Sequence, residues 1–196
     1  IVLVDSYAPN LSFDSIVIEN TTGAITAVNH LLEQGHTDIG LIGWARSSPP
    51  SINERFSGYN RALEAHNIPT RYVEESGLNR EEGYNATTRL LKRAPEVTAI
   101  FACNDLTAIG AIHAARDMGL TVPGDLSIAG FDNIDMAREV TPALTTVHVC
   151  KTWLGIFGVR QLIARALNPE QPKTITTIMT DLVIRESTGH PENRSR

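Results

Sequence analysis

The chain has 196 residues, 42% of them hydrophobic and 20% charged, and a formal net charge of −5. This composition is typical of a soluble globular protein with one good-sized core or two small ones. No cluster of Lys and Arg is longer than two residues, so the chain lacks the basic surface of a nucleic-acid-binding module. It contains no run of 18 apolar residues and no export signal, so we expect a cytoplasmic protein without a membrane partner.

Short apolar strands and amphipathic helices alternate along the chain. The first two strands are expected at Ile1–Asp5 and Ser15–Glu19, with a turn-rich loop between them. A helix follows the capping residues 20–23 and ends at Gly35. Further strands are expected at Ile39–Gly43, Arg71–Glu75, Ala99–Cys103, Ser127–Phe131 and Thr145–Val149, and further helices at Asn53–His66, Arg80–Lys92, Asp105–Met118 and Lys151–Leu167.

This alternation predicts an α/β fold with a parallel, doubly wound sheet and right-handed crossovers. The last stretch, Thr174–Glu186, is expected to be one long extended segment that can bend at Asp181. Cys103 and Cys150 lie in or beside apolar strands, which favours buried, reduced thiols over a disulfide.

Polar side chains follow three of the apolar strands. Asp132 and Asn133 come after one strand, Asn104 and Asp105 after another, and the strand ending at Gly43 leads through a loop to an arginine-bearing helix. The carboxyl ends of parallel strands share one edge of a sheet, and ligands of open α/β sheets bind beyond that edge. The sequence therefore predicts a ligand-binding site there.

Six sequence blocks carry a resemblance to one protein family. In chain order they are LLEQGHTDIGLIG, ERFSGYNRAL, IFACNDLTAIGA, VPGDLSIAGFDN, TPALTTV and LVIRESTG. Together they closely resemble the effector-binding core of the lactose/galactose-repressor family of bacterial transcription regulators, over the chain from Ile1 to about Gly189. The resemblance implies the periplasmic binding protein-like type I fold, in which three crossovers join two subdomains.

The resemblance also implies a domain organisation. It assigns residues 20–148 and 181–189 to a complete, five-stranded C-terminal effector-binding subdomain, residues 1–19 and 150–180 to a partial N-terminal subdomain, and residues 190–196 to a tail. In the family, three further βα units, a hinge and a helix-turn-helix precede the strand that resembles Ile1–Asp5. We therefore expect an N-terminally truncated chain that lacks its DNA-binding domain.

Ligand contacts follow from the same resemblance. Arg55, expected in the first turn of its helix with Ser51 just upstream, resembles the ligand-clamping arginine, and Asp5 resembles a carboxylate contributed by the other subdomain. A ligand that bridges the two subdomains would favour their closed state. The full set of expected ligand-binding residues is Asp5, Ser51, Arg55, Asn104, Phe131 and Asp132.

Each of these residues has a structural alternative. Arg55 can be a solvated arginine of the helix surface, and Phe131 a core residue rather than an apolar wall. Asn104 and Asp132 can cap the helices that follow them, although Asp105 is the better candidate for the first cap.

Other side chains have weaker assignments. Trp44 can stack on a sugar ring or belong to the core or a lid, and Trp153 is expected to pack within its helix layer. In the family, variable positions that set specificity correspond to Val4, Ile18 and Leu78.

The sequence contains no catalytic constellation. The six histidines have no metal-ligand spacing, and there is no GxSxG elbow, Walker loop or GxGxxG motif after a strand. We therefore expect neither an enzyme nor a bound cofactor or metal. A nucleotide-dependent enzyme is the weakest hypothesis, because this sequence contains no phosphate-binding loop.

The leading hypothesis is the ligand-sensing domain of a DNA-binding repressor, with a small polar effector that we expect to be a sugar; purines and nucleosides are the exception in the family. DNA contact would come only through the missing N-terminal domain. A homodimer is expected through the helix Asp105–Met118, which is apolar over more than one stripe, and the segment Thr141–Thr146. The alternative is a periplasmic sugar-binding protein of a transporter.

Overall fold

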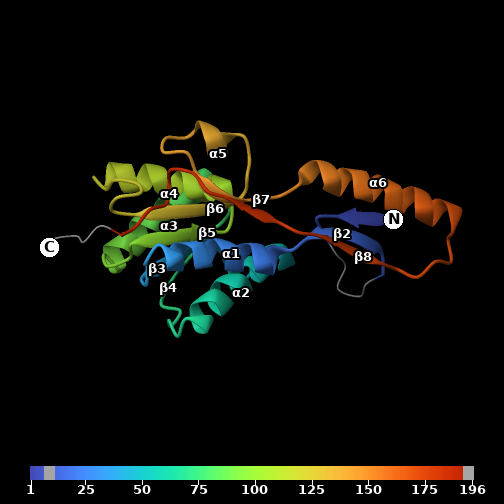
Figure 1. Ribbon diagram of the computed structural model, residues 1–196, viewed down its shortest axis with the longest axis horizontal. Helices are drawn as coiled ribbons and strands as arrows, with labels where there is room; N and C mark the ends of the chain where they lie inside the picture. The colour runs from blue at the N-terminus through green and yellow to red at the C-terminus, as the bar shows by residue number, and fades with distance from the viewer. Residues whose placement is uncertain (7–11, 192–196) are drawn as a thin grey trace. The chain divides into compact units, whose positions relative to one another are not determined.

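The computed structural model describes residues 1–6 and 12–191. They form two compact units (Figure 1). The smaller unit contains Ile1–Glu19 and Val149–Thr180, and the larger contains Asn20–His148 and the chain from Asp181 onward. The chain thus passes between the units three times. No helix in the described ranges is long and apolar enough to cross a membrane.

A six-stranded sheet forms the centre of the larger unit. Its order is β4–β3–β5–β6–β7–β9, and the neighbouring strands are parallel except β7 and β9. All five predicted strands of this unit are present, with β9 as an antiparallel sixth. The strands are β3 (Ile39–Trp44), β4 (Tyr72–Glu75), β5 (Ala99–Ala102), β6 (Ser127–Asp132), β7 (Thr145–His148) and β9 (Asp181–Val183).

Two helix pairs cover this sheet. One pair packs against residues such as Ile42, Ile100 and Ile128, which lie on the same face because side chains alternate along a strand. The other pair packs on the opposite face, as Figure 1 shows. The first pair is α3 (Arg80–Arg93) with α4 (Asp105–Asp117), the second is α1 (Asn20–Glu33) with α2 (Pro50–Ala65), and a short helix, α5 (Met136–Glu139), follows β6.

Glycines allow close approach within both helix pairs. A Cβ atom at Gly58 of α2 would lie 2.7 Å from the Cβ of Ala24 in α1. A Cβ atom at Gly110 of α4 would lie 2.7 Å from the backbone nitrogen of Tyr84 in α3. Both distances are too short for real carbon atoms, so these backbones pack closely only because glycine occupies the contact.

The smaller unit consists of a three-stranded parallel sheet and one long helix. Its strand order is β1 (Val2–Val4), β2 (Asp14–Ile18) and β8 (Ile175–Ile178), and α6 (Lys151–Leu167) packs on β1 and β2. Arg165 of α6 makes two parallel hydrogen bonds to the buried Asp14 carboxylate, 2.8 Å from Nε to Oδ2 and 2.9 Å from Nη2 to Oδ1. This pair fixes the helix against the sheet.

Several sequence predictions about the fold need correction. Thr174–Glu186 forms two strands rather than one, and the break falls just before Asp181, where a bend was expected; β8 pairs with β2, whereas β9 pairs with β7 in the other sheet. The second helix begins at Pro50, three residues before the predicted start, because proline is well suited to the first helical turn. Trp153 is only partly packed, since 47% of its surface is exposed while its ring lies 5.5 Å from that of Phe157.

Helix α4 also differs from expectation. Its alanine and isoleucine side chains are buried by α3 and β6 of the same chain. The apolar width of α4 is therefore explained by the sheet and a neighbouring helix, and it gives no reason for a dimer through this helix. Both cysteines are free thiols, with Cys103 buried and Cys150 half-buried.

Candidate functional site

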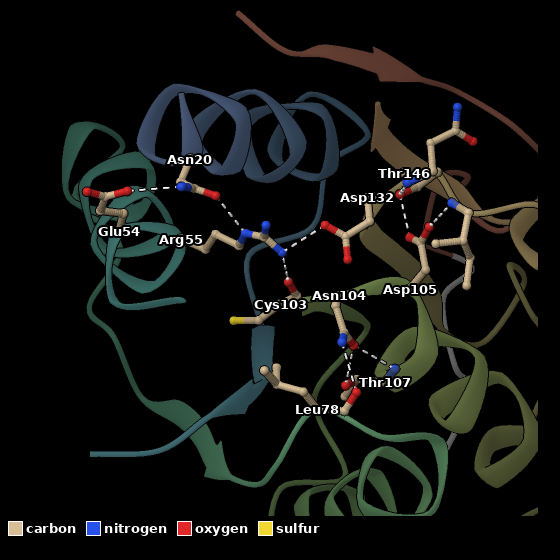
Figure 2. A network of polar contacts seen from close by, with 12 residues as sticks. Asn20, Glu54, Arg55, Leu78, Cys103, Asn104, Asp105, Thr107, Asp132 and Thr146 are labelled. Carbon is tan, nitrogen blue, oxygen red and sulfur yellow. Dashed lines mark hydrogen bonds and ion pairs between the residues drawn. The ribbon is translucent and has the colours of Figure 1, made fainter. Parts of the chain in front are cut away.

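Arg55 lies at the centre of a buried polar network in the larger unit (Figure 2). It is in the second turn of α2, not the first, and only 4% of its surface is exposed. Its Nε donates to Asn20 Oδ1 at 2.9 Å, and its Nη1 donates to the Cys103 carbonyl at 2.7 Å. The guanidinium also lies 3.8 Å above the centre of the Phe131 ring. Arg55 is therefore not a solvated surface residue.

Asp132 is a partly exposed member of this network. Its Oδ1 lies 3.2 Å from Arg55 Nη1, and 29% of its side chain is accessible. It is the last residue of β6 and has a φ of 113°, and Asn133 follows with a φ of 49°. Residues other than glycine rarely adopt such backbone angles, which cost about 1–3 kcal/mol each and persist only where surrounding contacts enforce them.

The backbone after Asp132 is held by buried acceptors. Asp105, which has no exposed surface, accepts the backbone N–H of Ile134 at 2.8 Å through Oδ2. The same carboxylate accepts a hydrogen bond from the Thr146 hydroxyl through Oδ1. The first residue of α4 thus ties the end of β6 to β7.

Asn104, not Asp105, caps α4. Its Oδ1 accepts from the Thr107 backbone N–H at 2.9 Å and from the Thr107 hydroxyl, while its Nδ2 donates to the Leu78 carbonyl at 2.8 Å. The prediction that Asp105 would cap this helix is therefore wrong. Asp132 caps no helix either, since α5 begins four residues later.

The remaining predicted ligand residues have different positions. Ser51 is half-buried in the first turn of α2, one turn before Arg55 and therefore on the same helix face. Phe131 has no exposed surface and supports Arg55 from below, which matches the core alternative. Asp5 is exposed and belongs to the smaller unit, where its backbone N–H donates to Ile16.

Trp44, at the end of β3, stacks on another aromatic ring of the same unit. Its ring lies 4.3 Å from that of Phe56, nearly parallel to it, and its Nε1 donates to Asn53 Oδ1 at 2.8 Å. Both partners are in α2. The tryptophan thus anchors the β3–α2 loop to the helix that carries Arg55.

Two residues of the network were missed by sequence reasoning. Asn20 is almost fully buried and links Arg55 to Glu54, since its Nδ2 donates to Glu54 Oε2 at 3.0 Å. We had assigned Asn20 only to a helix cap. It comes two residues after the end of β2, with Glu19 between them, so a search for polar residues near strand ends could also have identified Asn20.

The chemistry of this network favours binding over reaction. Burial raises the pKa of the Cys103 thiol to about 12, so the thiol stays protonated and a poor nucleophile. Within the described parts of the chain, no cluster of three or more His, Cys, Asp or Glu side chains could hold a metal ion. The Asp132 carboxylate is accessible, and its charge is matched by the buried guanidinium of Arg55. Such a group accepts hydrogen bonds from hydroxyls or amines.

The fold and the site define an α/β ligand-binding domain with polar groups at the carboxyl ends of its central strands. The sequence profile of the periplasmic binding protein-like domain family matches residues 28–188, and the chain belongs to this family. The predicted type I fold is confirmed, since solved structures of LacI family regulators share it over almost the whole chain.

Three similar proteins illustrate these relationships. The HTH-type transcriptional repressor PurR of Mannheimia succiniciproducens is 34% identical over 95% of this chain and 56% of its own length. A LacI family transcriptional regulator from Enterococcus faecium, solved with bound ribose, has a TM-score of 0.89 and 29% identity over 97% of this chain and 71% of its own. The transcriptional regulator CelR, in complex with cellobiose, has a TM-score of 0.87 and 28% identity over 95% of this chain and 57% of its own.

These comparisons confirm the resemblance to the effector-binding core of the lactose/galactose-repressor family. The chain spans little more than half the length of the curated repressors that it matches.

Proposed function

We propose that this chain is the ligand-sensing domain of a cytoplasmic DNA-binding transcriptional repressor. The effector is a small, polar, hydroxyl-rich molecule, and binding involves no turnover. The observation that carries the proposal is the Asp132 carboxylate, partly exposed at the end of a central strand and held by the buried Arg55. A carboxylate fixed in this way accepts hydrogen bonds from two hydroxyls of one ligand.

A neutral sugar suits this site better than a phosphorylated ligand. Arg55 already neutralises Asp132 and donates to Asn20 and Cys103, so an anion would have to compete for those donors. The bound ribose and cellobiose of the two similar regulators support the same ligand class. Arg55 in this proposal chiefly positions Asp132, while Ser51 and Asn104 border the ligand.

Regulation would arise from differential affinity. Asp5 belongs to the smaller unit, so a ligand that contacts both Asp5 and Asp132 binds most tightly to a closed arrangement of the domain. Such a ligand shifts the population toward that arrangement. In the full-length repressor this shift would change DNA affinity through a further N-terminal domain and a homodimer.

A sugar-binding protein of a transporter would use the same fold. The curated relatives are repressors, and this favours the regulatory proposal. Analytical ultracentrifugation separates the two, because a regulator of this kind is expected to dimerise whereas a transporter's binding protein is expected to be a monomer.

A thermal-shift screen tests ligand sensing. The panel contains monosaccharides, disaccharides, phosphosugars and nucleosides, because a ligand that binds the native state raises the apparent stability. We expect a neutral sugar to raise Tm in the unmodified chain and in Asp135→Ala, but not in Asp132→Ala. Asp135 is a matched control, since it is three residues further on and its side chain is 87% exposed. Equal shifts in both variants, or stabilisation by phosphosugars alone, would contradict the proposal.

A further inference from the structure

The side chain of Asn133, next to Asp132 in the chain, contacts residues of β7 and of the segment after β9. Its Oδ1 accepts from Arg185 Nη2 at 2.7 Å, and its Nδ2 lies 3.0 Å from His148 Nδ1. Its backbone N–H also faces the Thr146 hydroxyl, at 3.4 Å. Thr146 and His148 belong to β7, and Arg185 follows β9. All of these groups lie in the larger unit.

The chemistry of Arg185 fixes the direction of these hydrogen bonds. A guanidinium has only donors, so the amide oxygen of Asn133 must face Arg185 and the amide nitrogen must face His148. His148 therefore accepts through Nδ1 and carries its proton on Nε2. The amide is oriented by one partner that can only donate and one that accepts.

Arg185 is itself held in place. Its Nη1 donates to the Leu144 carbonyl at 2.7 Å, and its backbone N–H donates to the Thr145 hydroxyl at 2.9 Å. Residues at the start of β7 and just before it thus hold Arg185 while its guanidinium donates to Asn133. A lysine at this position could not donate to both Leu144 and Asn133 with the same planar geometry.

The positive φ angles of Asp132 and Asn133 explain why the hydrogen bonds of the Asn133 side chain matter. Asp132 has a φ of 113°, which residues other than glycine rarely adopt, and Asn133 has a φ of 49°, in the left-handed region that asparagine tolerates better than most residues. The side chain of Asn133 is bonded on both sides, and the backbone N–H of Ile134 is bonded to Asp105. These bonds hold the turn that directs Asp132 toward Arg55.

We propose that Asn133, with Arg185 and His148, is a positioning residue that holds Asp132 in its ligand-binding orientation without touching the ligand. The expected effect of Asn133 on ligand affinity rests on the proposed function. The structural part of the proposal concerns the Arg55–Asp132 ion pair alone and can be tested without a ligand.

The first readout is therefore a crystal structure of the Asn133→Gly variant. Glycine accepts the positive φ but removes both side-chain bonds. We expect the distance from Arg55 Nη1 to Asp132 Oδ1, 3.2 Å in the native chain, to exceed 4 Å in the variant, beyond the range of an ion pair. Asn67→Gly is the matched control, because Asn67 also has a positive φ, 58°, and follows the C-terminal end of α2. An ion pair that is unchanged in Asn133→Gly would overturn the proposal.

The second readout is the affinity for D-ribose, measured by calorimetry. We expect Asn133→Gly to weaken binding about tenfold, or 1.4 kcal/mol, and Asn133→Asp, which keeps the acceptor for Arg185, to weaken it less. In an Asp132→Asn background, Asn133→Gly should change affinity less than twofold, because the group that it positions is already altered. Additive effects would mean that Asn133 acts independently of Asp132 and would overturn the proposal. If the native chain does not bind D-ribose, ribose sensing fails, and the crystal structure alone decides the positioning role.

Discussion

The replacement of Arg55 by alanine tests whether the buried network is a structural unit. The change removes hydrogen bonds to Asn20 and the Cys103 carbonyl, the ion pair with Asp132 and the stacking on Phe131. Hydrogen bonds to charged groups contribute about 1.5–3 kcal/mol each, but the contributions do not add fully within one network. We expect a loss of about 4 kcal/mol in the free energy of unfolding, less than the sum of the separate contributions. For a chain of this size this corresponds to roughly 10 °C in Tm.

Urea unfolding followed by tryptophan fluorescence measures this loss. Trp44 stacks on Phe56 in the larger unit, whereas Trp153 lies in the smaller one, so the assay uses a Trp153→Phe background. Arg55→Lys keeps the charge but not the fork of donors, and we expect about half of the loss. Arg61→Ala, an exposed position on the same helix, should stay within about 0.5 kcal/mol. A loss below about 1 kcal/mol for Arg55→Ala would refute the network as a structural unit.

Three further predictions concern packing and pH. Gly110→Ala should destabilise by about 1–3 kcal/mol in urea unfolding, because its Cβ would collide with the backbone of α3; Gly155→Ala, which meets nothing within 4 Å, should be neutral or stabilising. Burial lowers the pKa of His36, so the neutral form stabilises the fold above about pH 6.5, and Tm should fall as the pH decreases below this value; a flat Tm from pH 7 to 5 would contradict this. The Arg165 guanidinium, together with Thr174, holds the pKa of the Asp14 carboxyl well below its usual range, so its contribution persists above about pH 4 and is lost in stronger acid. An Asp14→Asn variant should lack that low-pH loss.

The order of strands and helices could be predicted because each element carries its own pattern. Apolar runs such as Ile39–Gly43 and the helix spacing after Asn20 are local signals, and the structure follows them within a few residues. The local pattern alone did not separate β8 from β9, because both strands lie in one extended run. The subdomain boundary expected at Asp181 came with the family resemblance, and the structure explains it by the pairing of β8 with β2 and of β9 with β7.

The candidate site was only partly predictable for a related reason. A polar residue after an apolar strand is visible in the sequence, and this signal identified Asn104 and Asp132. The burial of Arg55 depends on the Phe131 ring and on acceptors from α1 and from Cys103 just after β5, which are distant in sequence. The choice of Asn104 over Asp105 as the cap of α4 depends on Thr146 and Ile134, which bind Asp105 instead. Such competition between partners is set by tertiary structure.

A crystal structure of the chain grown with the neutral sugar that gives the largest thermal shift tests the central claim most directly. We predict a ligand hydroxyl within about 2.5–3.0 Å of the Asp132 carboxylate, with the Arg55–Asp132 ion pair intact. A sugar bound away from the carboxyl ends of β3, β5 and β6, or one that leaves Asp132 without a ligand contact, would contradict the account.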